Sequence, residues 1–406
     1  MTLTGPPDDA TRPPAVVEVV TLGESMVTFL PSRPGRLADV PSFERAIGGA
    51  ESNVACVLAA AGHTVKWVSR VGADGFGDHL LETIGSHGVD ISAVRRDASR
   101  PTGVYFRTAG DRSTDAHEVA YYRAGSAASA MSPATVDAHA LHSARVLHLS
   151  GITAALSKAC LALLTALTAP RPARPLISFD VNYREGLWPD PATAGTTLLA
   201  LARGADLVFV GEDEAEEAWG ITGGPEAVRE ALPEPGVLVV KNGSRGATLF
   251  EARPPARPHP RTAAHPSHSP DGAGTTARPQ EPTALREPAP RQGPTPPHEP
   301  TPPRPDTITF APALTVDVVA PVGAGDAFAA GFLSATLRAL PPAQRLRHGH
   351  LTAAAALTVP GDLAAPPSRG HADRLAALDD DAWGRLRLGP GWTNAADRAQ
   401  EEVPTP

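Results

Sequence analysis

The sequence predicts an α/β fold with a mainly parallel central sheet, helices on both faces of that sheet and a small separate β sheet. Short apolar runs alternate with helical patterns along most of the 406 residues. That alternation is typical of βαβ units, which build parallel sheets. Residues 24–45 and 100–123 contain strand-like pieces with no helix between them, and they predict the small sheet.

The predicted elements follow the chain in order. Predicted strands of the central sheet are 16–22, 65–70, 145–149, 176–180, 206–210 and 237–240. Predicted helices between them include 51–62, 77–86, 157–168 and 193–203. Two more strands, 247–250 and one around 307–310, flank a stretch of different composition.

Residues 252–306 are rich in proline, and Leu285 is their one large aliphatic residue. Such a segment cannot bury enough apolar surface to offset its ordering entropy. We therefore expect a disordered insertion within one domain that spans residues 16–384. Residues 1–15 are expected to be a disordered tail, and residues 385–406 a loose C-terminal tail. The histidines of the insertion are too irregularly spaced to indicate a metal site.

Composition excludes several classes of protein. The net charge of -8 argues against a nucleic-acid partner. No stretch approaches the ~20 apolar residues of a membrane span. The N-terminal residues have neither the basic start nor the apolar run of a signal peptide. Cys56 and Cys160 lie in apolar helical patterns, as buried thiols of a reducing compartment do. We expect a cytoplasmic protein with no membrane contact.

The stretch VDVVAPVGAGDAFAAGF, residues 317–333, carries the strongest chemical signal. Gly323 and Gly325 let the backbone approach a ligand closely. The following helix begins with free N–H groups that suit an anion. Asp326 is stabilised there in its charged form and could accept a proton from an alcohol beside a bound phosphate. The plainer alternative is that Asp326 only caps the helix.

Other nucleotide-binding motifs are absent from the sequence. No G-x-x-x-x-G-K-[ST] loop is present, and no G-x-G-x-x-G follows the first predicted strand. Three further stretches accompany residues 317–333: AIGGAESNVACVLAAAG (46–62), RVGADGFGDHLLETIGSHGVD (70–90) and KNGSRGATLF (241–250). Together the four resemble the ribokinase-like, or phosphofructokinase-B type, carbohydrate kinases over about residues 16–251 and 307–368. The resemblance implies that family's three-layer fold, with the small sheet as a lid.

The resemblance also implies roles for individual residues. Gly49 and Asn53 would hold sugar hydroxyls, although a helix with a polar first turn is the alternative for them. The amides of Gly323, Ala324 and Gly325 would form an anion hole, with Asp326 as the general base. The implied nucleotide-side residues are Asn182, Lys241, Gly243, Ser244 and Gly246, together with Gly323 and Gly325. A plain hairpin turn is the alternative for residues 241–246.

The sequence departs from the family pattern at two places. Ala320-Pro321-Val322 stands where Asp-Thr usually precedes the Gly-Ala-Gly-Asp stretch. Gly211 stands where the family's Asn-x-x-Glu motif has asparagine, with Glu214 in the glutamate position. The resemblance implies that Glu214 positions magnesium through water. The alternative is that residues 212–217 form a solvated acidic first turn of a helix.

Two stretches narrow the substrate, AYYRAGSAAS (120–129) and DVNYREGLW (180–188). They carry Arg123 and Arg184, and two arginines near one small sugar favour a carboxylate-bearing substrate, which guanidinium groups bind through two hydrogen bonds. The alternative is that both arginines form structural ion pairs. Tyr121 and Tyr122 alternate in a strand, so one packs and one faces the sugar, and the pattern leaves open which.

These stretches resemble 2-keto-3-deoxygluconate kinases. In that subfamily the Tyr-Tyr-Arg stretch, the later arginine and the aspartate at the position of Asp362 contact the sugar acid. The expected activity is ATP- and Mg²⁺-dependent conversion of 2-keto-3-deoxygluconate to its 6-phosphate. The rival hypotheses are a kinase for a neutral sugar such as fructose or ribose, and a catalytically silent sugar-binding protein. The lid is also expected to support a homo-oligomer.

Overall fold

The computed structural model describes residues 17–33, 35–108, 119–252 and 306–397. The chain divides into one unit, residues 1–251 and 307–406, and a second unit, residues 252–306. The predicted tail 1–15 lies outside the described residues, as does the predicted insertion except for its two end residues. Every described helix and strand belongs to the first unit.

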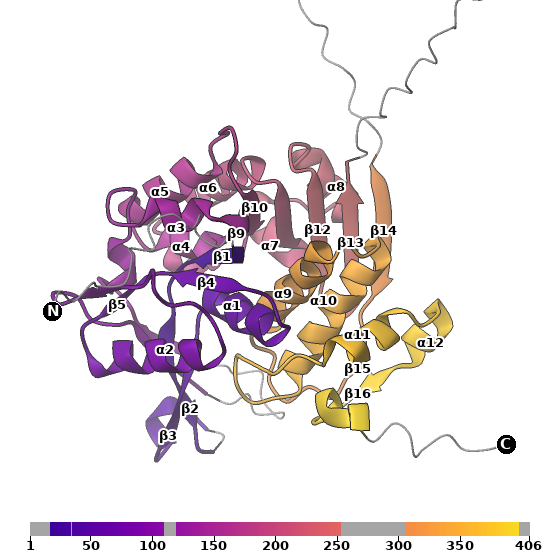
Figure 1. Ribbon diagram of the computed structural model, residues 1–406, viewed down its shortest axis with the longest axis horizontal. Helices are drawn as coiled ribbons and strands as arrows, with labels where there is room; N and C mark the ends of the chain where they lie inside the picture. Colours follow the sequence, from indigo (N-terminus) through magenta and orange to yellow (C-terminus); the bar gives the residue numbers. More distant parts are fainter. Residues whose placement is uncertain (1–16, 34, 109–118, 253–305, 398–406) are drawn as a thin grey trace, which may run out of the picture. The chain divides into compact units, whose positions relative to one another are not determined.

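Within the described residues, eight strands form one sheet in the order β14-β13-β12-β11-β10-β9-β1-β4 (Figure 1). The strands are β1 (Val17–Leu22), β4 (Val65–Val68), β9 (Ala144–Ser150), β10 (Leu176–Asp180), β11 (Leu207–Gly211), β12 (Val237–Asn242), β13 (Gly246–Glu251) and β14 (Thr307–Pro312). Neighbouring strands from β4 to β12 are parallel, whereas β13 and β14 pair antiparallel. The predicted mainly parallel sheet is confirmed.

Helices cover both faces of this sheet. The helices are α1 (Ala50–Ala60), α2 (Gly75–Ser86), α3 (Ala138–His142), α4 (Gly151–Ala155), α5 (Lys158–Thr168), α6 (Pro191–Arg203), α7 (Glu212–Trp219), α8 (Gly224–Ala231), α9 (Ala324–Leu337), α10 (Pro342–Leu357), α11 (Arg369–Ala376) and α12 (Asp380–Arg385), with 3-10 helices η1 (Leu37–Asp39), η2 (Ala128–Ala130), η3 (Glu185–Leu187) and η4 (Trp392–Asp397). Within the described ranges, none of them combines the length and apolar character needed to cross a bilayer.

Alternate residues of the buried strands face the two helical layers, because side chains along a strand point to opposite faces. On β11, Val208 and Val210 join a core with α5 and α6. Leu207 and Phe209 on the same strand join a second core with α1 and α9. A strand buried on both faces must be apolar at nearly every position, as the continuous run LVFV is. The result is a three-layer arrangement.

A second sheet has the order β3-β2-β7-β8. Its strands are β2 (Met26–Pro31), β3 (Phe43–Gly48), β7 (Val104–Arg107) and β8 (Val119–Tyr122). The two stretches without helices therefore pair with each other, as the sequence predicted. Two short parallel pairs complete the strands: β5 (Arg70–Gly72) with β6 (Arg95–Asp97), and β15 (Thr315–Val316) with β16 (Arg387–Leu388).

The prediction of a loose tail from residue 385 is wrong for its first part. Strand β16 pairs with β15, and Leu388 and Trp392 are buried in a core with Trp383. A two-residue strand and scattered large side chains have no periodicity that a sequence pattern can reveal. Their order comes from packing against α10 and α11. Residues 398–406 lie outside the described part of the chain.

Helices α9 and α10 pack side by side at an unusually close point (Figure 1). A Cβ added to Gly331 of α9 would lie 2.0 Å from Thr352 Oγ1 and 2.4 Å from the carbonyl oxygen of His348. Only glycine lets the α10 backbone come so near. This contact holds the middle of α9 against α10.

We expect Gly331→Ala to lower the free energy of unfolding by about 1–3 kcal/mol, because the added methyl group forces the two backbones apart. Urea unfolding followed by circular dichroism measures this. Gly370→Ala in α11 is the matched control, since its Cβ would meet nothing nearer than Arg374 Nη1 at 3.7 Å. Glycine-to-alanine changes at open helical positions stabilise by up to about 1 kcal/mol. Equal effects of the two changes would contradict the packing argument.

Candidate active site

The carboxyl ends of three adjacent parallel strands bring polar residues to one edge of the sheet. Asp180 ends β10, Gly211 ends β11, and Lys241 is the penultimate residue of β12. Open α/β sheets bind ligands at this edge. The first turn of α9, with Asp326, borders the same place, because Lys241 Nζ lies 3.7 Å from the position of a Cβ on Gly325.

The chain enters α9 through a tight turn at Gly323. This residue has a left-handed φ of 71° and precedes Ala324 and Gly325, which begin the helix. A Cβ on Gly323 would lie 2.1 Å from the carbonyl oxygen of Asp362. Both the conformation and the space therefore require glycine. The turn leaves the first amides of α9 without helical partners, which favours an anion at this end.

Asp326 is partly accessible to solvent and is held by one side chain. Asn53 Nδ2, in the first turn of α1, donates a hydrogen bond to Asp326 Oδ2 at 2.9 Å. Asn53 is 3 % exposed, and its Oδ1 has no hydrogen-bond partner within the described chain. A buried acceptor without a donor is costly. It is a natural place for the hydroxyl group of a bound molecule.

The surroundings of Asp326 raise its pKa to about 7, so they disfavour the charged form that the sequence predicted to be stabilised at the helix start. Burial is the largest cause, since it disfavours the charged carboxylate, and the negative charge of Asp180 acts in the same direction. The hydrogen bond from Asn53 and the charges of Arg184 and Lys241 oppose the shift. A carboxyl group with a pKa near neutral pH can both accept and release a proton, as a general base must.

Lys241 and Asp180 form a buried ion pair beside this carboxylate. Lys241 Nζ donates to both oxygens of Asp180, at 3.2 Å and 3.1 Å, and the two side chains are 19 % and 4 % exposed. Burial disfavours the charged lysine, but Asp180 and Glu214 outweigh it and raise the pKa of Lys241. The lysine is therefore charged throughout the neutral pH range.

Glu214, which the sequence placed near magnesium, is already paired. Its Oε2 accepts from the Gly211 amide at 2.8 Å, and its Oε1 lies 3.5 Å from Arg184 Nη1. The nearby Asp180 carboxylate is occupied by Lys241. The described residues contain no cluster of three His, Cys, Asp or Glu side chains that could hold a metal ion. These donors do not fit a magnesium ion held directly by the protein.

The predicted nucleotide-side stretch 241–246 is a hairpin turn between β12 and β13. Gly243 and Ser244 are exposed at its tip. Gly246 is buried with a φ of 142°, and a Cβ there would lie 2.3 Å from the carbonyl oxygen of Ala311. Gly246 is thus required by packing against β14, whereas the tip of the turn is open to a ligand.

Asn182, the other predicted nucleotide-side residue, has an unusual backbone. Its φ is 42°, in the left-handed region, and the residue is buried. Asparagine tolerates this conformation better than most residues do. Asn182 lies between Asp180, which pairs with Lys241, and Arg184, which pairs with Glu214. The turn at Asn182 thus lies between two residues that have different partners.

Asp362 contacts the small sheet. Its carboxylate accepts from the Tyr105 hydroxyl at 2.5 Å and pairs with Arg107 at 2.9 Å. A Cβ on Gly48 would lie 2.1 Å from the Tyr105 hydroxyl. The predicted substrate-side aspartate therefore links β7 to the loop that packs on Gly323, close to the start of α1.

The two tyrosines lie on opposite faces of the small sheet. Tyr121 lies opposite Tyr105 across β7 and β8, with ring centroids 5.4 Å apart, on the face that reaches Asp362. Tyr122 lies on the other face, edge-on to Phe106 at 6.0 Å. Tyr121 is 51 % exposed, so its ring is available to a molecule on the site face.

Arg123 is held by a buried carboxylate that the sequence did not single out. Its Nε donates to Glu24 Oε2 at 2.7 Å, its Nη2 also contacts Glu24, and the Ser126 hydroxyl donates to Glu24 Oε1. The Arg123 and Glu24 side chains are both buried. Gly49 is packed here too, because a Cβ on it would lie 2.4 Å from the Glu24 carbonyl oxygen.

The predicted residues fall into three groups rather than one. In the first, the pair Asn53–Asp326 and the pair Arg184–Glu214 are linked electrostatically by Lys241 and Asp180. The other two groups, Asp362 with Tyr105 and Arg123 with Glu24, lie on the small-sheet side. The sequence reading missed Asp180, Glu24 and Tyr105. Asp180 and Glu24 each follow an apolar strand closely, a signal that could have identified them.

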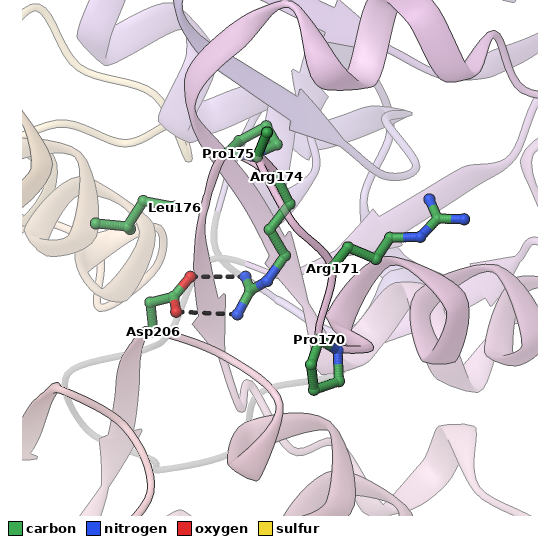
Figure 2. Close-up of a pocket in the computed structure, with 7 residues that line it drawn as sticks. Pro170, Arg171, Arg174, Pro175, Leu176 and Asp206 are labelled. Atoms are coloured by element: carbon green, nitrogen blue, oxygen red, sulfur yellow. Dashed lines mark hydrogen bonds and ion pairs between the residues drawn. The ribbon is translucent and has the colours of Figure 1, made fainter. Parts of the chain in front are cut away.

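A wide pocket of about 550 Å³ lies at the opposite, amino-terminal edge of the sheet, lined by Arg171, Arg174, Leu176 and Asp206 among others. Figure 2 shows the Arg174 guanidinium bridged to both oxygens of Asp206. Asp206 Oδ2 also accepts from the Ile177 amide at 2.7 Å. The charges of Arg174 and Asp206 are thus already paired with each other, and the pocket lies away from the residues described above.

The chain is similar in sequence to several curated kinases. The 2-dehydro-3-deoxygluconokinase of Thermoproteus tenax is 35% identical over 239 residues, 58% of this chain and 72% of that protein. The enzyme of the same name from Bacillus subtilis (strain 168) is 31% identical over 367 residues, 89% of this chain and 95% of that protein. Fructokinase-1 of Oryza sativa subsp. japonica is 33% identical over 235 residues, 57% and 72% of the two chains.

A solved PfkB protein from Polaromonas sp. JS666 superposes with a TM-score of 0.66 at 30% identity, covering 88% of this chain and 99% of the other. The three-layer fold predicted from the sequence is therefore confirmed. The family model described as "pfkB family carbohydrate kinase" matches residues 17–274 and 305–369. The chain belongs to the pfkB family of carbohydrate kinases and is a sugar kinase.

Proposed function

We propose that this kinase transfers the γ-phosphoryl group of ATP to the terminal hydroxyl of 2-keto-3-deoxygluconate, also named 2-dehydro-3-deoxygluconate, giving the 6-phosphate. The observation that carries the proposal is Asp326: a partly accessible carboxyl group with a pKa of about 7, at the amide-rich start of α9 and held by Asn53. A hydroxyl and a phosphate that meet there would find a base and an anion site together.

In the proposed step, Asp326 accepts the proton of the terminal hydroxyl. The hydroxyl oxygen forms a bond to the γ-phosphorus, and the bond from that phosphorus to the β–γ bridging oxygen breaks, so that ADP leaves. The amides of Gly323, Ala324 and Gly325 offset charge on the phosphoryl oxygens. The small sheet, joined to the body through Asp362, would exclude water from the reaction.

Two observations support a sugar acid as the substrate. The relatives from Thermoproteus tenax and Bacillus subtilis are both named 2-dehydro-3-deoxygluconokinase. Arg184 is 55 % exposed. Its Nη1 donates to the Tyr183 carbonyl oxygen at 2.7 Å and lies 3.5 Å from Glu214 Oε1, and the exposed part of the guanidinium can still reach a substrate carboxylate. Tyr121 would line the same space, and Arg123 would contribute donors that Glu24 leaves free.

A neutral hexose such as fructose is the second candidate. The fructokinase relative is one observation in its favour. The other is electrostatic: Arg123 and Arg184, from which the sequence argued for an acid, each already have a carboxylate partner.

Magnesium would come with the phosphates of ATP, because Glu214 and Asp180 are occupied. The lid as an oligomer contact and a cytoplasmic location stay predictions.

Asp326→Asn should lower kcat by about 10²- to 10⁴-fold while ATP still binds, because the amide keeps the shape but cannot accept the proton. Coupled ADP-release assays with 2-keto-3-deoxygluconate and with fructose measure the loss. Asp379→Asn, which only changes the cap of α12, is the control and should keep kcat within about twofold. Normal turnover by the Asp326 variant would refute the general-base role.

The pH dependence of kcat/KM follows from the raised pKa of Asp326. The carboxylate must be ionised to act as base, so activity should fall about tenfold per pH unit below about pH 7 and level off above it. Asn53→Ala removes the hydrogen bond that favours the ionised form. The half-maximal pH should therefore move upward in this variant. A profile that stays flat down to pH 5 would contradict the assignment.

Arg184→Ala should raise KM for 2-keto-3-deoxygluconate by about tenfold or more, because one charge-assisted contact to the carboxylate is lost. It should leave KM for fructose nearly unchanged. Arg171→Ala, an arginine at the opposite edge of the sheet, is the control. Arg123→Ala is less informative, because it strands the buried Glu24 carboxylate and should destabilise the fold by about 3–5 kcal/mol. Equal effects on both sugars would favour the neutral-hexose candidate.

A further inference from the structure

The Lys241–Asp180 pair occupies a defined place relative to the reacting groups. Both oxygens of Asp180 hold the ammonium, so the lysine side chain has one arrangement rather than many. The two residues come from β12 and β10, and β11 lies between them in the sheet. The pair therefore spans the carboxyl edge at which the site is assembled, at the ends of strands whose preceding residues are buried.

The ammonium is directed at the start of α9. It lies 3.7 Å from the position of a Cβ on Gly325, so no side chain separates it from that turn of the helix. It acts electrostatically on Asp326, Glu214 and Asp180 together. A phosphoryl group bound by the first amides of α9 would lie beside Asp326 and within reach of this ammonium.

Of the two cations that act on Asp326, Arg184 and Lys241, Lys241 is the more firmly held. Arg184 is half-exposed and paired with Glu214, and the carboxylates that could have received a metal ion are occupied. Negative charge grows on the phosphoryl oxygens during transfer, and a preorganised cation offsets it without reorganisation. Lysine serves in this way as a point charge for phosphate.

We propose that Lys241 is a catalytic residue whose ammonium binds the transferring γ-phosphoryl group, and that Asp180 is the positioning residue that holds it there. The proposal for Lys241 rests on the proposed phosphoryl transfer from ATP, but it does not depend on which sugar accepts the phosphoryl group. Lys241 forms and breaks no bond; it contributes only charge and a hydrogen bond to a phosphoryl oxygen. Asp180 acts on the phosphoryl group through Lys241, and its charge separately raises the pKa of Asp326.

The first test compares Lys241→Met, Asp180→Asn and the double variant. The double variant replaces the ion pair by two neutral side chains, so it should fold even if Lys241→Met, which strands Asp180, does not. We expect Lys241→Met and the double variant to lose about 10²- to 10³-fold in kcat, with the sugar KM within about twofold. Lys241→Arg should recover part of the loss, because the charge returns.

The positioning role of Asp180 is tested by the double-mutant cycle. The assays are run at about pH 9, where Asp326 is ionised in each variant and its pKa no longer affects the rate. Under these conditions Asp180→Asn alone should lower kcat about tenfold, but it should lower kcat no further in the Lys241→Met background, because the remaining effect passes through the lysine. Equal losses in both backgrounds would overturn the positioning role. Arg174→Met is the matched control: it breaks an ion pair at the other end of the same strands (Figure 2) and should change thermal stability but not kcat.

A binding measurement tests the proposal independently of the sugar. Calorimetric titration with the ATP analogue adenylyl imidodiphosphate and with ADP gives the affinity that the γ-phosphate adds. The ratio of the affinity for the analogue to the affinity for ADP should fall at least about tenfold, or about 1.4 kcal/mol, in the double variant relative to the wild type. An unchanged preference in a folded double variant would overturn the proposal. A wild type that phosphorylates neither sugar would instead refute the proposed substrates and leave this binding result to decide the role of Lys241.

Discussion

The rest of the site depends on the balance of charge among Asp326, in the first turn of α9, and the nearby Asp180 and Lys241. Burial and the negative charge of Asp180 push the proton onto Asp326, whereas the ammonium and the Asn53 amide favour the carboxylate. The resulting pKa of about 7 lies where a general base works best. A shift of any one of these groups would move the pKa away from neutral pH.

The same principle of matched charges extends across the site. Arg123 pairs with Glu24, Arg184 with Glu214, and Arg107 with Asp362, so the described cations of the site each have a carboxylate partner. Such pairs fix side chains before a ligand arrives, which preorganises the site. They also mean that the number of arginines does not measure the positive charge that a substrate meets. The strength and exposure of each pair decide this, and Arg184 has the loosest of them.

The body of the domain supplies rigidity where the chemistry needs it. Asp180 and Lys241 stand at the ends of strands buried on both faces, and α9 is held against α10 at Gly331. The small sheet reaches the body through the polar contacts of Tyr105, Arg107 and Asp362. It is also joined to the body by Val27 and Ile47, which are buried in the core with α1 and α9.

The sequence by itself determined the fold class, the order of the strands along the chain and the candidate base, because periodicity and the Gly-Ala-Gly-Asp stretch are local properties of the chain. It also marked Asn53, which follows the Gly48-Gly49 pair, and Lys241, which precedes a recognisable turn. Only the tertiary structure decided which groups meet. Asn53 and Asp326 are 273 positions apart, and Glu24 and Arg123 are 99 apart, so no local pattern joins them. The pairing of Lys241 with Asp180, the choice between Tyr121 and Tyr122, and the order of residues 387–397 all depend on how distant strands and helices pack, which sequence spacing does not encode.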